Sequence, residues 1–203
     1  MSLSSPGSYE PFVETLISSG PRFKSFLDVG CGMGHYGLAA RMYASAWHHQ
    51  DQDPDPAMRN ISLVGVDINE TTILPHHRSL YDQVLLGGIQ DLISHLQQFD
   101  VVWIGDCIEH MKDEIAIPAL KNLWEHTEQL LMLATVKVYT LYETKKLGTI
   151  HASHRSAWPP EKVAEVLGCP ISVHERNRQY FMWAWKTEPC TFRDEMPTFE
   201  VKG

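Results

Sequence analysis

The chain has 203 residues, of which 43% are hydrophobic, and this size fits one domain with a substantial core. Its formal net charge is −8 at pH 7 and no basic block stands out, which predicts no nucleic-acid partner. No apolar run reaches about 18 residues, so we expect no membrane span or membrane partner. The four cysteines form no C-x-x-C pair, and we interpret them as reduced thiols of a cytoplasmic protein.

Apolar strand patterns alternate with amphipathic helix patterns through most of the chain. The helices are expected at residues 9–19, 35–46, 71–81, 92–98, 115–126 and 159–167. The strands are expected at residues 25–30, 61–67, 83–86, 99–105, 129–136, 171–176 and 180–186. About five strand–helix units followed by a hairpin predict a doubly wound α/β sandwich.

The first expected strand runs into a glycine-rich turn that starts a helix. Asp28, Gly30, Gly32 and Gly34 form the pattern D-x-G-x-G-x-G, and the turn also reads as G-x-G-x-x-G through Gly37. Glycine is needed where the backbone bends through positive φ or lies against a ligand. The following helix directs free N–H groups to the same place. Because a carboxylate at the strand end would repel a pyrophosphate, the pattern disfavours a nicotinamide cofactor.

This stretch resembles the cofactor loop of the class I methyltransferases, which bind S-adenosylmethionine. The resemblance covers about residues 8–186 and implies a mostly parallel, seven-stranded Rossmann-like sheet closed by an antiparallel hairpin. We expect one domain over 1–203, with 187–203 as a polar tail. The resemblance implies that the loop, including Cys31, holds the methionine end of the cofactor.

The second expected strand ends in an acid, Asp67, which is followed by Ile68. An acid at this place in a dinucleotide-type fold binds the ribose hydroxyls, although it can also cap the next helix. The resemblance places the adenine after the third strand, where the family often has an acid but this chain has Gly88. Ile89 and Gln90 are therefore assigned to the base.

The fourth expected strand is followed by Asp106, which we add to the cofactor site, and then by Glu109 and His110. An apolar strand followed by an acid and Glu-His resembles the fourth motif of many class I methyltransferases. His154 lies after the fifth strand, and loops after neighbouring parallel strands meet above the sheet. Histidine suits a general base because its pKa lies near working pH. We predict Glu109, His110 and His154 as catalytic, with structural hydrogen bonding as the alternative role for each histidine.

A metal site is the alternative for the same residues. Asp106, Glu109 and His110 are spaced i, i+3 and i+4, which would place them on one face of a helical turn. With His154 they resemble the metal set of the small-RNA 3′-end 2′-O-methyltransferases, and such ligands suit Mn, Fe or Zn. Glu-His is also widespread in class I enzymes without metal, so we predict no metal ligand. The pattern His-Arg-Ser-x-Trp at 154–158 resembles bacterial methyltransferase-like proteins of unassigned substrate.

The sequence therefore predicts an S-adenosylmethionine-dependent methyltransferase. The acceptor is expected to be an oxygen or nitrogen of a small molecule or of a small carrier-bound group, because about 200 residues leave little beyond the cofactor-binding core. The alternatives are a metal-assisted RNA 2′-O-methyltransferase and a partner subunit that binds S-adenosylmethionine without catalysis.

Overall fold

The structure is a computed structural model that describes residues 6–18, 23–46, 61–137, 154–176 and 178–186. The expected tail at 187–203 lies outside these residues. No helix within the described ranges combines the length and the apolar character that crossing a bilayer requires. The described cysteines, Cys31, Cys107 and Cys169, are free thiols.

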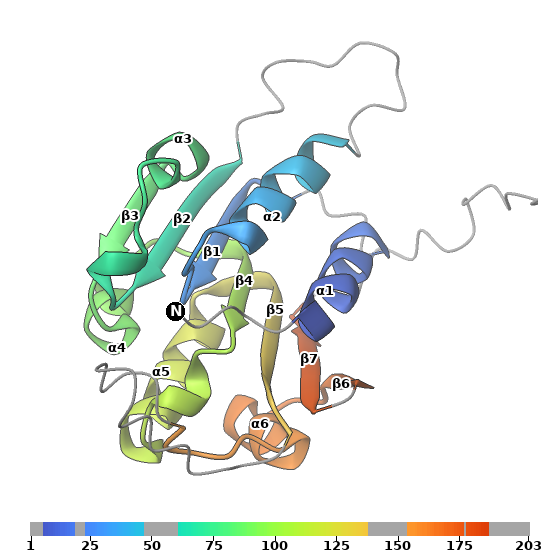
Figure 1. The fold of residues 1–203 in the computed structure, drawn as a ribbon. Helices are drawn as coiled ribbons and strands as arrows, with labels where there is room; N and C mark the ends of the chain where they lie inside the picture. The colour runs from blue at the N-terminus through green and yellow to red at the C-terminus, as the bar shows by residue number, and fades with distance from the viewer. Residues whose placement is uncertain (1–5, 19–22, 47–60, 138–153, 177, 187–203) are drawn as a thin grey trace, which may run out of the picture.

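Seven strands form one sheet in the order β3-β2-β1-β4-β5-β7-β6 (Figure 1). Their bounds are Ser25–Val29 for β1, Ser62–Asp67 for β2, Gln83–Leu86 for β3, Phe99–Gly105 for β4, Thr127–Val136 for β5, Ser172–Arg176 for β6 and Gln179–Trp185 for β7. Strands β1 to β5 are parallel, whereas β7 runs antiparallel to both of its neighbours. This confirms the doubly wound, mostly parallel seven-stranded sheet with its closing hairpin.

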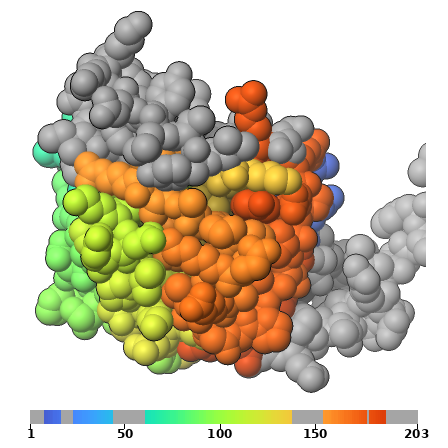
Figure 2. Space-filling view, turned by 90° about the horizontal axis from the view of Figure 1, so that it is seen from below, coloured from blue at the N-terminus to red at the C-terminus, as the bar shows by residue number. Residues whose placement is uncertain are grey.

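The helices cover both faces of the sheet and bury two separate apolar clusters. Their bounds are Pro6–Ser18 for α1, His35–Ala46 for α2, His77–Leu80 for α3, Ile89–Leu92 for α4, Asp113–Glu125 for α5 and Pro160–Leu167 for α6. On one face, α1 and α2 pack over the sheet through Phe12, Leu16 and Tyr36. On the other face lie α4, α5 and α6. Figure 2 shows the orange segment that includes α6 packed directly beside the yellow-green α5.

The predicted bounds of two helices are wrong. The helix expected over 71–81 is a short 3-10 turn, η3 (Glu70–Thr72), followed by α3. Pro75 lies between them and cannot continue a helix, because it lacks a backbone N–H and its ring clashes with the preceding turn. The helix expected over 92–98 starts earlier, at α4, and ends in the 3-10 turn η4 (Ile93–His95).

The strand order places the chemistry-bearing loops side by side. Strands β1 and β4 are neighbours, and the chain continues outward from them in opposite directions, toward β3 on one side and β6 on the other. Every residue of β4 is buried, as expected for a central strand covered on both faces. In such sheets a ligand binds outside the carboxyl ends of the strands, at the point where the order reverses. The glycine loop after β1 and the segment after β4 both lie at that point.

Candidate functional site

The loop after β1 has the backbone that its glycines predict. Gly30, Gly32 and Gly34 have φ values of 76°, 48° and 81°, in the left-handed region that favours glycine. The N–H groups of Gly30 and Cys31 donate to the carbonyl of Val66 in β2, at 2.8 and 3.0 Å. The loop is therefore tied to the neighbouring strand by backbone hydrogen bonds. The Cys31 side chain is buried beneath it, and this burial raises the pKa of the thiol.

Asp67 lies at the end of β2, against this loop, and is half-buried. One carboxylate oxygen accepts a hydrogen bond from the N–H of Gly32, and the other accepts one from the N–H of Asn69, both at 2.8 Å. Each oxygen of a carboxylate has a second lone pair, so both can still accept a ligand hydroxyl. The cap of η3 is Asn69, whose side chain accepts from the N–H of Thr71, so Asp67 does not serve as that cap. The neighbouring Ile68 is exposed.

Asp28 lies inside the protein, below the loop. Its side chain is 1% exposed and accepts a hydrogen bond of 2.6 Å from the hydroxyl of Tyr81. Burial raises the pKa of this carboxyl group to about 7, and the charge of Asp67 adds to the effect. Gly37 is needed beside this pair, because a Cβ there would lie 2.3 Å from the Tyr81 hydroxyl oxygen. Asp28 thus contacts Tyr81, which packs beneath the glycine loop.

Residues of α3 and the residue before it support the glycine loop, and sequence reasoning missed them. The Nε2 atom of His77 lies 2.9 Å from the carbonyl oxygen of Gly32, and that of His76 lies 3.1 Å from the carbonyl oxygen of Met33. Because a carbonyl oxygen only accepts, Nε2 of His77 donates to Gly32, while its Nδ1 lies 3.0 Å from the backbone N–H and 3.1 Å from the carbonyl oxygen of Leu74. No periodicity or spacing in the sequence connects this histidine pair to a loop more than forty residues earlier.

The region assigned to the adenine lies at the start of α4. Ile89 is buried, whereas the side chain of Gln90 is exposed and donates a hydrogen bond to Asp91 at 2.8 Å. Gly88 is the N-cap of α4 and has no side chain to cap it.

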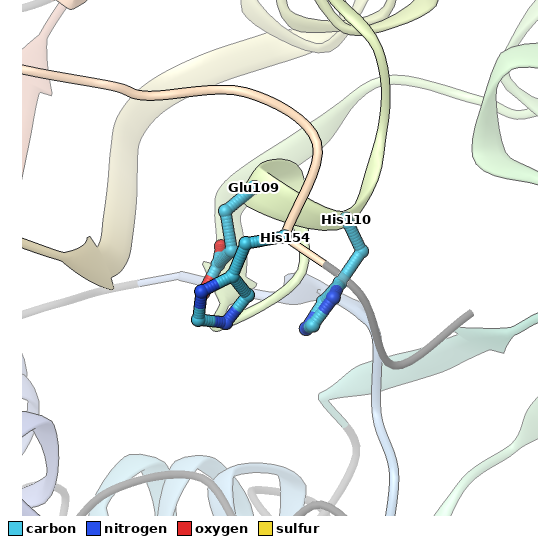
Figure 3. A group of neighbouring side chains, drawn as sticks. All are labelled: Glu109, His110 and His154. Atoms are coloured by element: carbon cyan, nitrogen blue, oxygen red, sulfur yellow. The ribbon is translucent and has the colours of Figure 1, made fainter. Parts of the chain in front are cut away.

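Glu109, His110 and His154 come together after β4 and β5, as the predicted topology requires (Figure 3). One nitrogen or oxygen of each side chain lies within 4.8 Å of the others. Glu109 and His110 belong to the 3-10 turn η5 (Ile108–His110), whereas His154 comes from the segment that leads to α6. The two imidazole rings are 5.1 Å apart between centroids. A further histidine of the loop before His154, His151, lies outside the described residues.

The environment of Glu109 favours the neutral acid. The side chain is 1% exposed, and burial together with the nearby charge of Asp106 raises its pKa to about 8. The hydroxyl of Thr135 donates to its Oε2 atom at 3.1 Å. A carboxyl group with a pKa near working pH can either donate or accept a proton.

The pattern His-Arg-Ser-x-Trp holds the His154 segment against η5. The carbonyl of Glu109 accepts from the N–H groups of Arg155 and Ser156, at 2.7 and 3.2 Å. The Ser156 hydroxyl donates to the carbonyl of Met111 and accepts from the indole N–H of Trp158, both at 2.7 Å. Trp158 is 1% exposed and anchors the segment in the core. These contacts give the motif a structural role, which is to position His154.

Asp106 does not join this cluster, which corrects the expected helical face. Its φ is 46°, and helical structure starts only at Ile108, so the spacing i, i+3, i+4 is not realised on one turn. The carboxylate accepts a hydrogen bond from the side-chain amide of Gln179 in β7 at 2.8 Å. The segment still adjoins the cofactor loop, because a Cβ on Gly30 would lie 2.9 Å from the Cβ of Cys107.

No family model matches the sequence, and the search of curated proteins finds no match. The structure is similar to an S-adenosylmethionine-dependent methyltransferase from Archaeoglobus fulgidus, with 18% identity and a TM-score of 0.60 over 89% of this chain and 95% of the other. It is also similar to magnesium protoporphyrin IX methyltransferase from Synechocystis with bound S-adenosylhomocysteine, with 16% identity and a TM-score of 0.59 over 88% and 81%.

A third similar structure is an O-methyltransferase family protein from Burkholderia thailandensis, with 14% identity and a TM-score of 0.59. The match covers 86% of this chain and 55% of the other, so the chain spans about half the length of that protein. At identities of 14 to 18% these likenesses establish a shared fold over most of the chain.

Proposed function

We propose that this chain, which has the fold of the class I S-adenosylmethionine-dependent methyltransferases, is itself a methyltransferase that acts on an oxygen or nitrogen of a small molecule. The observation that carries the proposal is the pairing of Asp67 with the glycine loop at the switch point of the sheet. It places a half-exposed carboxylate beside a left-handed glycine backbone, the combination that suits a ribose and a charged amino-acid moiety.

The cofactor residues divide into those that touch the ligand and those that shape the loop. Asp67 accepts the ribose hydroxyls, and the glycine backbone around Gly32 lies along the methionine end. Asp28 acts from below, because its contacts fix Tyr81 under the loop. The backbone from Gly88 to Ile89 and the side chain of Gln90 receive the adenine.

The acceptor side comprises Glu109, His110 and His154, which adjoin the loop through the segment after β4. In methyl transfer the acceptor atom attacks the methyl carbon in line, the carbon–sulfur bond breaks, and its electron pair stays on sulfur as a neutral thioether. The acceptor proton must leave, and the cluster is the group of described side chains suited to receiving it. Most of the remaining barrier is lowered by alignment and by exclusion of water.

Calorimetric titration of the full chain with S-adenosylhomocysteine tests the proposal. We expect binding near the micromolar level, which corresponds to about 8 kcal/mol. Replacement Asp67→Ala should weaken it by about 2 to 3 kcal/mol, the scale of hydrogen bonds to a charged group. Glu70→Ala is the matched control, because Glu70 is an exposed carboxylate in the same segment. Tight binding of NAD with no response to S-adenosylhomocysteine would refute the proposal.

A further inference from the structure

We propose that Glu109, His110 and His154 form a site for one divalent transition-metal ion. The proposal deepens the proposed function, and it rests on that function only for what the bound ion does to the acceptor. Binding of the ion itself depends on the geometry of the cluster alone.

The donor set determines which ion suits the site. Two imidazole nitrogens and one carboxylate oxygen match Zn²⁺, Mn²⁺, Fe²⁺ or Co²⁺, whereas Mg²⁺ and Ca²⁺ prefer oxygen ligands only. Two histidines with one glutamate are also the protein ligands of several catalytic zinc sites, which keep a position open for water or substrate. The set therefore indicates a site with room for an acceptor atom.

The spacing of the donor atoms is close to what a metal requires. They lie within 4.8 Å of one another. Ligand atoms at about 2.0–2.2 Å from a zinc ion are about 3–4 Å apart, so small side-chain rotations would complete the set. Figure 3 shows the carboxylate and the His154 ring close together, with the His110 ring beside them.

The surrounding contacts hold the ligands in place, as in metal sites whose outer groups orient the inner ones. Thr135 donates a hydrogen bond to the Glu109 carboxylate. The segment that carries His154 is held by the Ser156 hydroxyl, which donates to the carbonyl of Met111 directly after η5. The indole N–H of the buried Trp158 donates to the same hydroxyl.

Charge provides an independent reason. Glu109 is buried, and its Oε2 atom accepts a hydrogen bond from the Thr135 hydroxyl. A buried carboxylate is costly unless it is paired or bound to a metal. A divalent ion would stabilise the carboxylate over the neutral acid and leave a net positive site, which favours an acceptor whose oxygen can be deprotonated.

The bound ion would act on the acceptor as a Lewis acid. Ligand atoms bound to the ion cannot also take the acceptor proton, so with the ion in place an acceptor hydroxyl that binds it would lose its proton to solvent instead of to the cluster. The oxygen then forms a bond to the methyl carbon of the sulfonium as the carbon–sulfur bond breaks. The products are the methylated acceptor and S-adenosylhomocysteine, so no oxidant or reductant is needed.

The test uses the full chain without a histidine tag, stripped of metal with a chelator and then dialysed. It is titrated with Co²⁺ and with Zn²⁺ by calorimetry, and Co²⁺ binding is also followed by its visible absorption. We expect one ion per chain. His110→Ala and His154→Ala should each weaken binding by at least tenfold, since even outer-sphere changes cost about 10- to 100-fold.

His95→Ala and His174→Ala are matched controls, because both residues are exposed histidines away from the cluster, and they should change the affinity less than twofold. Glu109→Gln is the third ligand variant, and it removes the carboxylate with little change in volume. Circular dichroism melting establishes that each variant is folded.

Equal affinity in the wild-type protein and in all three ligand variants would overturn the metal site, as would the absence of one-to-one binding. The same samples are titrated with S-adenosylhomocysteine. Cofactor binding without metal binding rejects this inference and leaves the proposed function intact, whereas metal binding without cofactor binding rejects the proposed function alone.

Discussion

The two halves of the candidate site are built in different ways. The proposed cofactor side is made largely of backbone, since the glycine loop donates the Gly32 N–H to Asp67 and accepts a hydrogen bond from His77 at the Gly32 carbonyl. The acceptor side is made of side chains, which arrive from η5 and from the segment before α6. A backbone site is sensitive to changes in φ and close packing, whereas a side-chain site can lose one functional group and keep its shape. We therefore expect substitutions on the backbone side to lower stability and cofactor affinity, and substitutions on the side-chain side to lower turnover.

The largest expected effect is on the acceptor side. His110→Ala or His154→Ala should lower turnover by about 10²- to 10⁴-fold, the usual contribution of a positioned base, and a lost metal ligand would act through the same step. The affinity for S-adenosylhomocysteine should change less than twofold. Turnover is measured with an acceptor found by screening hydroxyl and amine compounds. If both variants retain full activity with that acceptor, the two histidines are structural.

The next effect is on the backbone side. Gly30→Ala places a Cβ at a φ of 76° and 2.9 Å from the Cβ of Cys107, so strain and overpacking add. We expect a loss of about 2 to 5 kcal/mol in the free energy of unfolding, measured by urea denaturation, together with loss of cofactor binding. Gly168→Ala is the control, because its φ is 67° but no atom lies within 4 Å of an added Cβ. Equal losses at the two positions would mean that contact with Cys107 contributes nothing.

On the side-chain half of the site, the Glu109 carboxyl group should make the free energy of unfolding depend on pH. Its pKa is raised from 4.5 to about 8 in the folded state, so the native protein binds this proton more tightly than the unfolded chain does. The contribution of this group to the free energy of unfolding is fully present below pH 4.5. It falls as pH rises toward 8, by up to about 1.4 kcal/mol per pH unit. Glu109→Gln removes the titration, so relative to wild type it should gain stability between pH 5 and 8.

This experiment is done with chelator present, by denaturant unfolding across the pH range. A constant difference between the two proteins at every pH would show that Glu109 is already ionised in the native state.

The smallest expected effect tests the support under the loop. His77→Leu removes the hydrogen bond to the Gly32 carbonyl and leaves that group unpaired, which costs about 1 kcal/mol or fivefold in cofactor affinity. Calorimetry with S-adenosylhomocysteine measures this change, and His77→Gln should recover part of it because its amide can donate. If stability falls while affinity stays unchanged in both variants, His77 is a core residue without influence on the site.

Much of the cofactor side follows from sequence, because its determinants are local. The turn from Gly30 to Gly34 needs positive φ, and the short apolar run that leads into it is typical of a buried strand. The acid at the end of the second strand is likewise read from its position beside an apolar run. Strand order and the closing hairpin then follow from the alternation of elements and from the family resemblance.

Tertiary structure decided the features that join distant parts of the chain. Nothing local says that His77 reaches Gly32, that Asp28 turns inward to Tyr81, or that Asp106 bonds to Gln179 and leaves the expected cluster. These contacts span tens of residues and depend on how the elements pack. Sequence periodicity records which face of each element is buried, whereas side-chain partners are chosen only when those faces meet.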